Sequence, residues 1–360
     1  MHRTNVVLVL LDDFGWKDST CYGSTFYETP NLDKLASQGM RFTDAYASCP
    51  VCSPTRASLL TGKYPARVGV TNWIDHSGSH PNCGKLIDVP YVKHLPLEEH
   101  TLASALRDAD YQTWHVGKWH LGLEPYWPKK QGFDVNIGGC QMGCPYNGYF
   151  SPWQIPTLPD GPEGEYLTDR ITDEAINLIS NRDQDKPFFL NMWYYTVHTP
   201  IQAKPDDIAY FQDKAKRMGI DTVEPFVEGE FFPCDHKKDM RVRRRVIQSD
   251  PVYAAMIKSM DENLGRLMQA IEDAGQNDNT LFIFTSDNGG LATAEGSPTS
   301  NAPLAEGKGW MYEGGTREPL IVKLPGVIAP GSITDCITTS TDIYPTVLEA
   351  VGLDLIPDQH

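Results

Sequence analysis

The chain has 360 residues and a formal net charge of −16, with 40% hydrophobic and 22% charged residues. This length allows one large α/β domain or two medium ones, each with a substantial core. The negative charge argues against a nucleic-acid partner, because a polyanion would be repelled over most of the surface, and no apolar stretch approaches the roughly 18 residues that a membrane span needs.

Short apolar runs alternate with amphipathic stretches along the whole chain. Apolar runs predict buried strands, and stretches with apolar residues on one face predict helices. In chain order we expect a strand at Val6–Leu11, helices at Leu32–Gln38 and Thr101–Asp108, a strand at Thr113–Val116, a helix at Ile171–Ser180, a strand at Pro187–Tyr194, a helix at Tyr253–Ala274, and strands at Leu281–Phe284 and Leu320–Val322. This alternation predicts an α/β fold with a large, mainly parallel (mixed) sheet sandwiched by helices.

Three regions do not show this alternation of apolar runs and amphipathic stretches. Residues 72–98 and 122–165 are rich in Gly, Pro and aromatic residues, which is typical of long functional loops. Residues 204–250 form a polar insertion that contains the basic run Arg241–Arg245. We interpret this run as a solvated helix face, with contact to an anionic substrate as the alternative.

The cysteines do not predict a disulfide scaffold, because eight in 360 residues are too sparse. Cys49 and Cys52 have redox-motif spacing, but the strand–helix–strand context of such a motif is missing, and no second pair completes a zinc site. We expect Cys140 and Cys144 to be buried thiols.

Acidic and amide residues follow two predicted strands. Asp12 and Asp13 come directly after the first strand, and Asp287 and Asn288 follow the strand at 281–284. Ligands of open α/β sheets bind beyond the carboxyl ends of the strands. An oxygen-rich site there predicts a hard divalent cation such as Ca²⁺ or Mg²⁺.

Cys52 precedes a predicted helix. Ser53 can cap this helix, Pro54 fits its first turn, and Gly62 can end it. Cys52 then lies at the positive end of the helix dipole with Arg56 one turn along, a favourable place for an anion and a reactive group. The alternative is a buried structural cysteine.

The motif Cys52-Ser-Pro-Thr-Arg56, followed by Leu60-Thr-Gly62, resembles the signature of the type I (formylglycine-dependent) sulfatases of the alkaline-phosphatase-like superfamily. Further segments resemble that family in the same order: Leu10–Asp13, Val116–Gly122, Val197–Pro200, Ser286–Gly289 and Gly307–Gly309 with Tyr312–Arg317. The resemblance covers about residues 4–352. It implies that residues 1–360 are an alkaline-phosphatase-like catalytic domain, and that the small C-terminal subdomain usual in the family is absent from this sequence.

The resemblance also implies the chemistry of the site. A maturation enzyme would oxidise Cys52 to Cα-formylglycine, whose hydrate would attack sulfur. One Ca²⁺ would be held by residue 52 and by Asp12, Asp13, Asp287 and Asn288.

The same resemblance assigns roles to five further residues. Arg56 and Lys118 would stabilise the formylglycine, and His120 would accept a proton from its second hydroxyl. His198 and Lys308 would bind sulfate oxygens and protonate the leaving alcohol, a role that suits a histidine titrating near neutrality. His115 lies outside these motifs and is expected to be structural.

The expected substrate is a sulfated carbohydrate, such as a mono- or oligosaccharide derived from a glycosaminoglycan. Aromatic residues in the two long loops favour a sugar, and we expect substrate contacts from Trp73, Asp75, His76, Tyr149 and Trp153. Two alternatives stay open: a phosphodiesterase or phosphonate monoester hydrolase of the same superfamily, and a catalytically silent binding protein that keeps Cys52 as a thiol.

The sequence gives one expectation on location and none on oligomeric state. The apolar run at 5–11 is too short for the core of a signal peptide. We therefore expect a cytoplasmic protein, with a secreted or periplasmic protein whose signal has been removed as the alternative.

Overall fold

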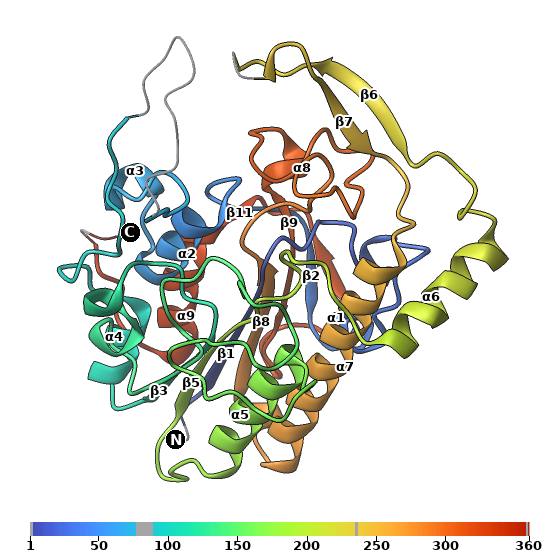
Figure 1. Ribbon diagram of the computed structural model, residues 1–360. Coiled ribbons are helices and arrows are strands. Elements are labelled where there is room, and N and C mark those ends of the chain that lie inside the picture. Colours follow the sequence, from blue (N-terminus) through green and yellow to red (C-terminus); the bar gives the residue numbers. More distant parts are fainter. Residues whose placement is uncertain (1–2, 77–88, 235–236, 358, 360) are drawn as a thin grey trace.

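The structure is a computed structural model that describes residues 3–76, 89–234, 237–357 and 359 (Figure 1). Within these ranges a nine-stranded sheet has the order β10-β2-β9-β8-β1-β5-β3-β4, with β11 paired to β2. Only β9 runs antiparallel to its neighbours in that part of the chain, so the sheet is mixed and mainly parallel, as predicted. The strands are β1 (Asn5–Leu11), β2 (Met40–Tyr46), β3 (Gln112–Gly117), β4 (Val135–Ile137), β5 (Phe188–Trp193), β8 (Thr280–Ser286), β9 (Arg317–Lys323), β10 (Ser332–Thr334) and β11 (Thr338–Thr339).

Helices cover both faces of this sheet (Figure 1). The first face is covered by α1 (Pro30–Gln38), α5 (Leu167–Ser180) and α7 (Pro251–Asp273), with α6 (Pro205–Met218) packed on α7. The second face is covered by α2 (Cys52–Thr61), α4 (Leu102–Asp108) and α9 (Ile343–Val351). Two short helices, α3 (Pro65–Val68) and α8 (Glu313–Thr316), lie in connections. The described part of the chain contains no helix with the length and apolar character of a membrane span.

The central strand β1 shows why the sheet is buried on both sides. All seven of its residues are buried, and successive side chains point to opposite faces. Val7, Val9 and Leu11 pack with α1, α5 and α7, whereas the intervening residues of the strand pack with α2, α4 and α9. An unbroken apolar run is therefore what this position requires.

The nine predicted elements are all present, with bounds that differ by a few residues. The prediction for the basic run was wrong. Arg241–Arg245 is strand β7, which pairs antiparallel with β6 (Phe226–Phe231) in a separate hairpin. Val242 is buried between Arg241 and Arg243, which are exposed with their guanidinium groups stacked on phenylalanine rings of the hairpin, and Arg245 at the end of the strand is buried.

Candidate active site

Helix α2 presents its first turn to the carboxyl edge of the sheet. Cys52 is its first residue, and all ten residues of the helix are buried. Gly62 ends the helix in the left-handed conformation with φ 68°, as expected. The predicted cap was wrong: Ser53 lies inside the helix, where its hydroxyl donates to the carbonyl of His120 and accepts from the amide of Ile74, both at 3.0 Å. These bonds tie the loop around residue 74 to the start of α2.

The ends of β1 and β8 bring the predicted acidic residues together. The two strands pair in parallel with Leu11 opposite Ser286, so the residues that follow lie side by side. The amide of Asp13 donates to Asp287 Oδ1 at 3.2 Å, and Asn288 Nδ2 donates to Asp13 Oδ1 at 2.7 Å. All four predicted metal ligands from these strand ends, Asp12 included, are fully buried.

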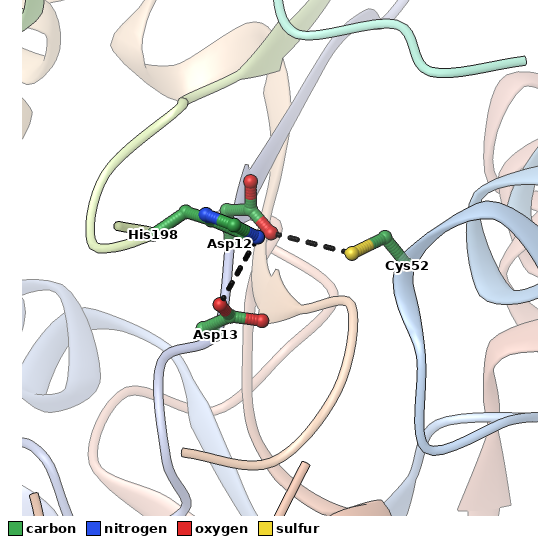
Figure 2. Close-up of side chains that lie close together, drawn as sticks. All are labelled: Asp12, Asp13, Cys52 and His198. Atoms are coloured by element: carbon green, nitrogen blue, oxygen red, sulfur yellow. Dashed lines mark hydrogen bonds and ion pairs between the residues drawn. The ribbon is translucent and has the colours of Figure 1, made fainter. Parts of the chain in front are cut away.

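A group of potential metal ligands lies at this edge (Figure 2). One ligand atom from each of Asp12, Asp13, Cys52 and His198 lies within 4.8 Å of the others. Asn288 Oδ1 is buried and has no hydrogen-bond partner among the described residues, which leaves an amide oxygen for an ion. Carboxylate and amide oxygens suit Ca²⁺, so the residues present fit the cation that the sequence predicts.

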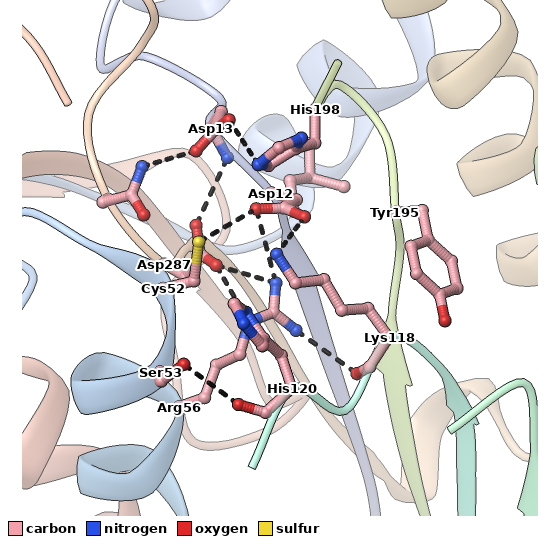
Figure 3. A network of polar contacts seen from close by, with 12 residues as sticks. Asp12, Asp13, Cys52, Ser53, Arg56, Lys118, His120, Tyr195, His198 and Asp287 are labelled. Carbon is pink, nitrogen blue, oxygen red and sulfur yellow. Dashed lines mark hydrogen bonds and ion pairs between the residues drawn. The ribbon is translucent and has the colours of Figure 1, made fainter. Parts of the chain in front are cut away.

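Two buried cations neutralise the carboxylates from the side of α2 and β3 (Figure 3). Arg56 Nε donates to Asp287 Oδ2 at 2.9 Å, Nη2 lies 2.7 Å from the same oxygen in an ion pair, and the guanidinium lies over the ring of Trp193. Lys118 Nζ donates to Asp12 Oδ2 at 2.6 Å. Burial opposes the charge of Lys118, but the carboxylate of Asp12 outweighs it and raises the pKa of the lysine.

Lys308 and His198 form the other side of the site. Lys308 Nζ donates to Asp13 Oδ2 and to His198 Nε2, both at 2.9 Å, and lies 3.2 Å from Glu295 Oε1. Burial and the nearby ammonium of Lys308 lower the pKa of His198 to about 4. His198 is therefore neutral at pH 7 in the free protein, which differs from the near-neutral titration expected for it.

His120 has one free ring nitrogen. Its Nε2 donates to the carbonyl of Ile74 at 2.9 Å, whereas Nδ1 is buried without a hydrogen-bond partner among the described residues. Burial, and next the charge of Lys118, lower the pKa of His120 well below its usual value. The ring is therefore neutral, with a lone pair on Nδ1 that can accept a proton.

The thiol of Cys52 is a poor nucleophile in this setting. Its Sγ lies 3.7 Å from Asp12 Oδ1, and burial raises the pKa of the thiol despite Lys118 and Lys308. A protonated thiol is a weak nucleophile, because the thiolate is the reactive form. The thiol is therefore expected to be protonated at pH 7.

A cavity of about 670 Å³ opens from Cys52, His120, His198 and Lys308 towards the surface. Of the predicted substrate contacts, Trp73, Asp75 and His76 line it; residues 77–88 of the same loop lie outside the described residues. Further wall residues were not predicted: Leu123, Gln141, Cys144, Tyr146, Ala294 and Glu295.

Tyr149 and Trp153 do not reach this cavity, so their predicted sugar contact was wrong. Both side chains are fully buried. The hydroxyl of Tyr149 bonds to the carbonyls of Tyr195 and His198 at 2.6 and 2.9 Å, and the indole of Trp153 donates to the carbonyl of Tyr149. These residues support the segment that carries His198.

Two smaller predictions concern residues near the site. Cys140 is buried, as predicted, whereas Cys144 is half-buried and contributes to the cavity wall. His115 is structural, as predicted: it is fully buried, its Nε2 donates to the carbonyl of Gly117, and its Nδ1 accepts from the amide of Asn191.

Comparisons with known proteins agree with this geometry. A sequence model of the family described as Sulfatase matches residues 4–353. N-acetylgalactosamine-6-sulfatase of Canis lupus familiaris is 32% identical over 97% of this chain and 62% of its own length, and arylsulfatase A of Homo sapiens is 33% identical over 98% of this chain and 64% of its own length. The crystal structure of Ps i-CgsB with k-i-k-neocarrahexaose superimposes with a TM-score of 0.78 and 29% identity, covering 100% of this chain and 74% of that one.

The chain thus spans about 62% of the length of the first curated relatives it matches. The family match nevertheless runs through every strand end and helix start described above, including the cysteine motif at the start of α2. The chain belongs to the sulfatase family.

Proposed function

We propose that this protein hydrolyses a sulfate ester of a carbohydrate, with Cα-formylglycine at position 52 and one bound Ca²⁺. One observation carries the proposal: Cys52 Sγ lies 3.7 Å from Asp12 Oδ1, at the positive end of the buried helix α2. Three buried cations, Arg56, Lys118 and Lys308, lie around it. An anionic ester is attracted to such a site although the whole chain is strongly negative.

Two groups, an aldehyde at residue 52 and a calcium ion, would supply the central chemistry. A hydrated aldehyde at residue 52 would provide the hydroxyl that attacks sulfur, and Ca²⁺ held by the strand-end oxygens would provide positive charge against a sulfate oxygen. Formation of the aldehyde requires a maturation enzyme as a partner. The high pKa of the unmodified thiol supports the need for this conversion.

The remaining steps belong to side chains of the chain itself. Arg56 and Lys118 neutralise the carboxylates beside residue 52 and hold its functional group in a fixed electrostatic environment. His120 accepts a proton at Nδ1, the nitrogen without a partner among the described residues. Lys308 holds a sulfate oxygen together with His198 and donates the proton to the leaving alcohol, because His198 is neutral at pH 7.

The cavity supports a saccharide as the alcohol component. Its volume of about 670 Å³ can hold a sugar unit, and the rings of Trp73 and Tyr146 in its wall offer apolar surfaces for stacking. The curated relatives include N-acetylgalactosamine-6-sulfatases, and a structural neighbour was solved with k-i-k-neocarrahexaose. Because these relatives are named for a sulfated sugar or were solved with a carbohydrate, we propose a sulfated sugar as the substrate, with a glycosaminoglycan-derived unit as the first candidate.

The test combines mass spectrometry with an activity assay. The protein is produced with a formylglycine-generating enzyme, and the peptide containing residue 52 is weighed to measure thiol-to-aldehyde conversion. The same sample is assayed for sulfate release from a panel of sulfated sugars, with and without a calcium chelator. Cys52→Ala should abolish release, whereas Cys140→Ala, which changes a buried thiol outside the cavity wall, should retain it.

Each outcome decides between the alternatives. Conversion together with calcium-dependent sulfate release supports the proposal. Full conversion without sulfate release, but with hydrolysis of a phosphodiester or phosphonate monoester, would assign that activity to the protein instead. A residue 52 that stays a thiol beside the maturation enzyme favours a binding protein.

A further inference from the structure

Glu295 is the acidic residue at the inner end of the cavity that the sequence did not predict. It follows β8 in a loop and adopts a left-handed backbone with φ 51°. Its Oε1 lies 3.2 Å from Lys308 Nζ, and its Oε2 accepts from the hydroxyl of Thr199 at 3.0 Å and lies 3.8 Å from His198 Nε2. Two independent contacts therefore aim this carboxylate at the groups proposed to hold the ester.

Because of Glu295, the carboxylates around the ester site outnumber the cations by one. The cations are Arg56, Lys118 and Lys308, and the facing carboxylates are Asp12, Asp13, Asp287 and Glu295. In formal charges, three cations against four carboxylates leave one negative charge among these residues. With the divalent cation that the strand-end oxygens fit, the site would carry one positive charge, which an ester with a single negative charge balances.

The rest of the described cavity wall offers no compensating cation. Its charged side chains besides Lys308 are the two carboxylates Asp75 and Glu295. A second negative charge on the ester would therefore meet Glu295 without a partner in the described wall.

We propose that Glu295 is a specificity-determining residue that restricts the site to an ester group with a single negative charge. The inference rests on the proposed function and deepens it. Sulfate and phosphate monoesters have similar shapes, but the phosphate carries close to two negative charges at pH 7. By sharing Lys308 with Asp13, Glu295 leaves less positive charge for the ester and so favours sulfate over phosphate.

The test measures binding separately from turnover. Glu295→Gln, which keeps the size of the side chain and removes its charge, is introduced into calcium-loaded Cys52→Ala protein. The dissociation constants of 4-nitrophenyl sulfate and 4-nitrophenyl phosphate, which share one alcohol, are then measured by calorimetry. We expect the ratio of phosphate affinity to sulfate affinity to rise about tenfold or more in Glu295→Gln.

Controls separate charge from a structural effect. Glu295→Asp keeps the charge and should keep the wild-type ratio even if both affinities fall. Glu262→Gln removes a carboxylate paired with Lys258 on α7, away from the cavity, and should change neither affinity. The same substitutions in fully converted enzyme should shift the ratio of kcat/KM values for the two esters in the same direction.

The outcomes distinguish the inference from the proposed function. An unchanged or lower phosphate-to-sulfate ratio in Glu295→Gln, beside a Cys52 enzyme that still releases sulfate, overturns only the role of Glu295. An equal fall in both affinities, not restored by Glu295→Asp, also overturns it, because that pattern indicates a structural role. If neither ester binds the Cys52→Ala protein and the converted enzyme releases no sulfate, the proposed function itself fails.

Discussion

The inner end and the outer wall of the cavity are built in different ways. The inner end consists of buried side chains from strand ends and the start of α2, joined by ion pairs between 2.6 and 2.9 Å. The outer wall consists of loop residues such as Trp73, His76 and Tyr146, which are more exposed. We therefore expect substitutions at the inner end to affect the proposed reaction most, and substitutions in the outer wall to affect mainly the binding of the proposed substrate.

Charge is the second difference between the two regions. At the inner end Asp12, Asp13 and Asp287 are buried, and each has a cationic partner that offsets the cost of burying its charge. The outer wall has aromatic rings and, in its described part, the carboxylate of Asp75, whereas Glu295 lies beside Lys308 at the inner end. Among the described residues, an anion entering the cavity therefore gains its favourable charge contacts at the inner end.

The largest effect is expected from Arg56→Met at the inner end. This change leaves the buried carboxylates of Asp287 and Asp12 without the guanidinium, so the free energy of unfolding should fall by about 3–5 kcal/mol. Sulfate release should fall by about 1,000-fold at a pH and temperature where the variant stays folded. Urea denaturation and initial rates measure the two effects. As a control, Arg107→Met at an exposed position on α4 should change neither the free energy of unfolding nor the rate of sulfate release. A stable and active Arg56→Met variant would show that the ion-pair network is dispensable.

A smaller effect is expected in the outer wall. Trp73→Ala and Tyr146→Ala remove rings that line the cavity, so KM for a sulfated sugar should rise about tenfold while kcat changes little. Steady-state kinetics on the best substrate of the panel measures this split. A fall in kcat with an unchanged KM would contradict the assignment of these rings to substrate binding.

Tyr149→Phe is the matched control for the wall residues, because it changes an aromatic residue behind the wall. It removes the hydroxyl that bonds to the carbonyls of Tyr195 and His198 and leaves the ring in place. We expect a loss of about 1–3 kcal/mol in the free energy of unfolding with KM unchanged. A rise in KM as large as that of Trp73→Ala would instead place Tyr149 in the binding surface.

The sequence predicted the inner end well because its residues follow local patterns. Asp12, Asp13, Asp287 and Asn288 come directly after apolar strands, and parallel pairing brings adjacent strand ends together. The bounds of buried strands and amphipathic helices follow from the same patterns. The hairpin of β6 and β7 was missed because four of the five residues of β7 are arginines, so its sequence shows no period-two alternation of apolar and polar residues.

The outer wall was less predictable because loop conformation decides which side chains reach the cavity. Tyr146 and Tyr149 are three residues apart in one loop, yet Tyr146 is exposed in the wall and Tyr149 is fully buried. Composition predicted aromatic residues in functional loops but could not tell these two apart. Glu295 had no motif of its own, and its role becomes visible only through contacts with Thr199 and Lys308, which are distant in sequence.

The smallest effect concerns His115, a buried histidine next to the inner end. Burial lowers the pKa of His115 to about 3, so the unfolded chain, with an ordinary histidine, binds a proton at a higher pH than the folded chain does. The folded state therefore loses stability as pH falls below about 6.5, and His115 alone accounts for about 2 kcal/mol between about pH 6.5 and about pH 5. His115→Phe fits the surrounding cluster of Trp119, Phe133 and Trp193 and removes this titration. The variant loses stability at every pH, because Asn191 and Gly117 lose their hydrogen-bond partner. The readout is therefore the slope of the unfolding free energy against pH, which measures the number of protons taken up on unfolding. In the variant this number should fall by about one. An unchanged slope would contradict the prediction, because it would mean that His115 binds protons equally in the folded and the unfolded chain.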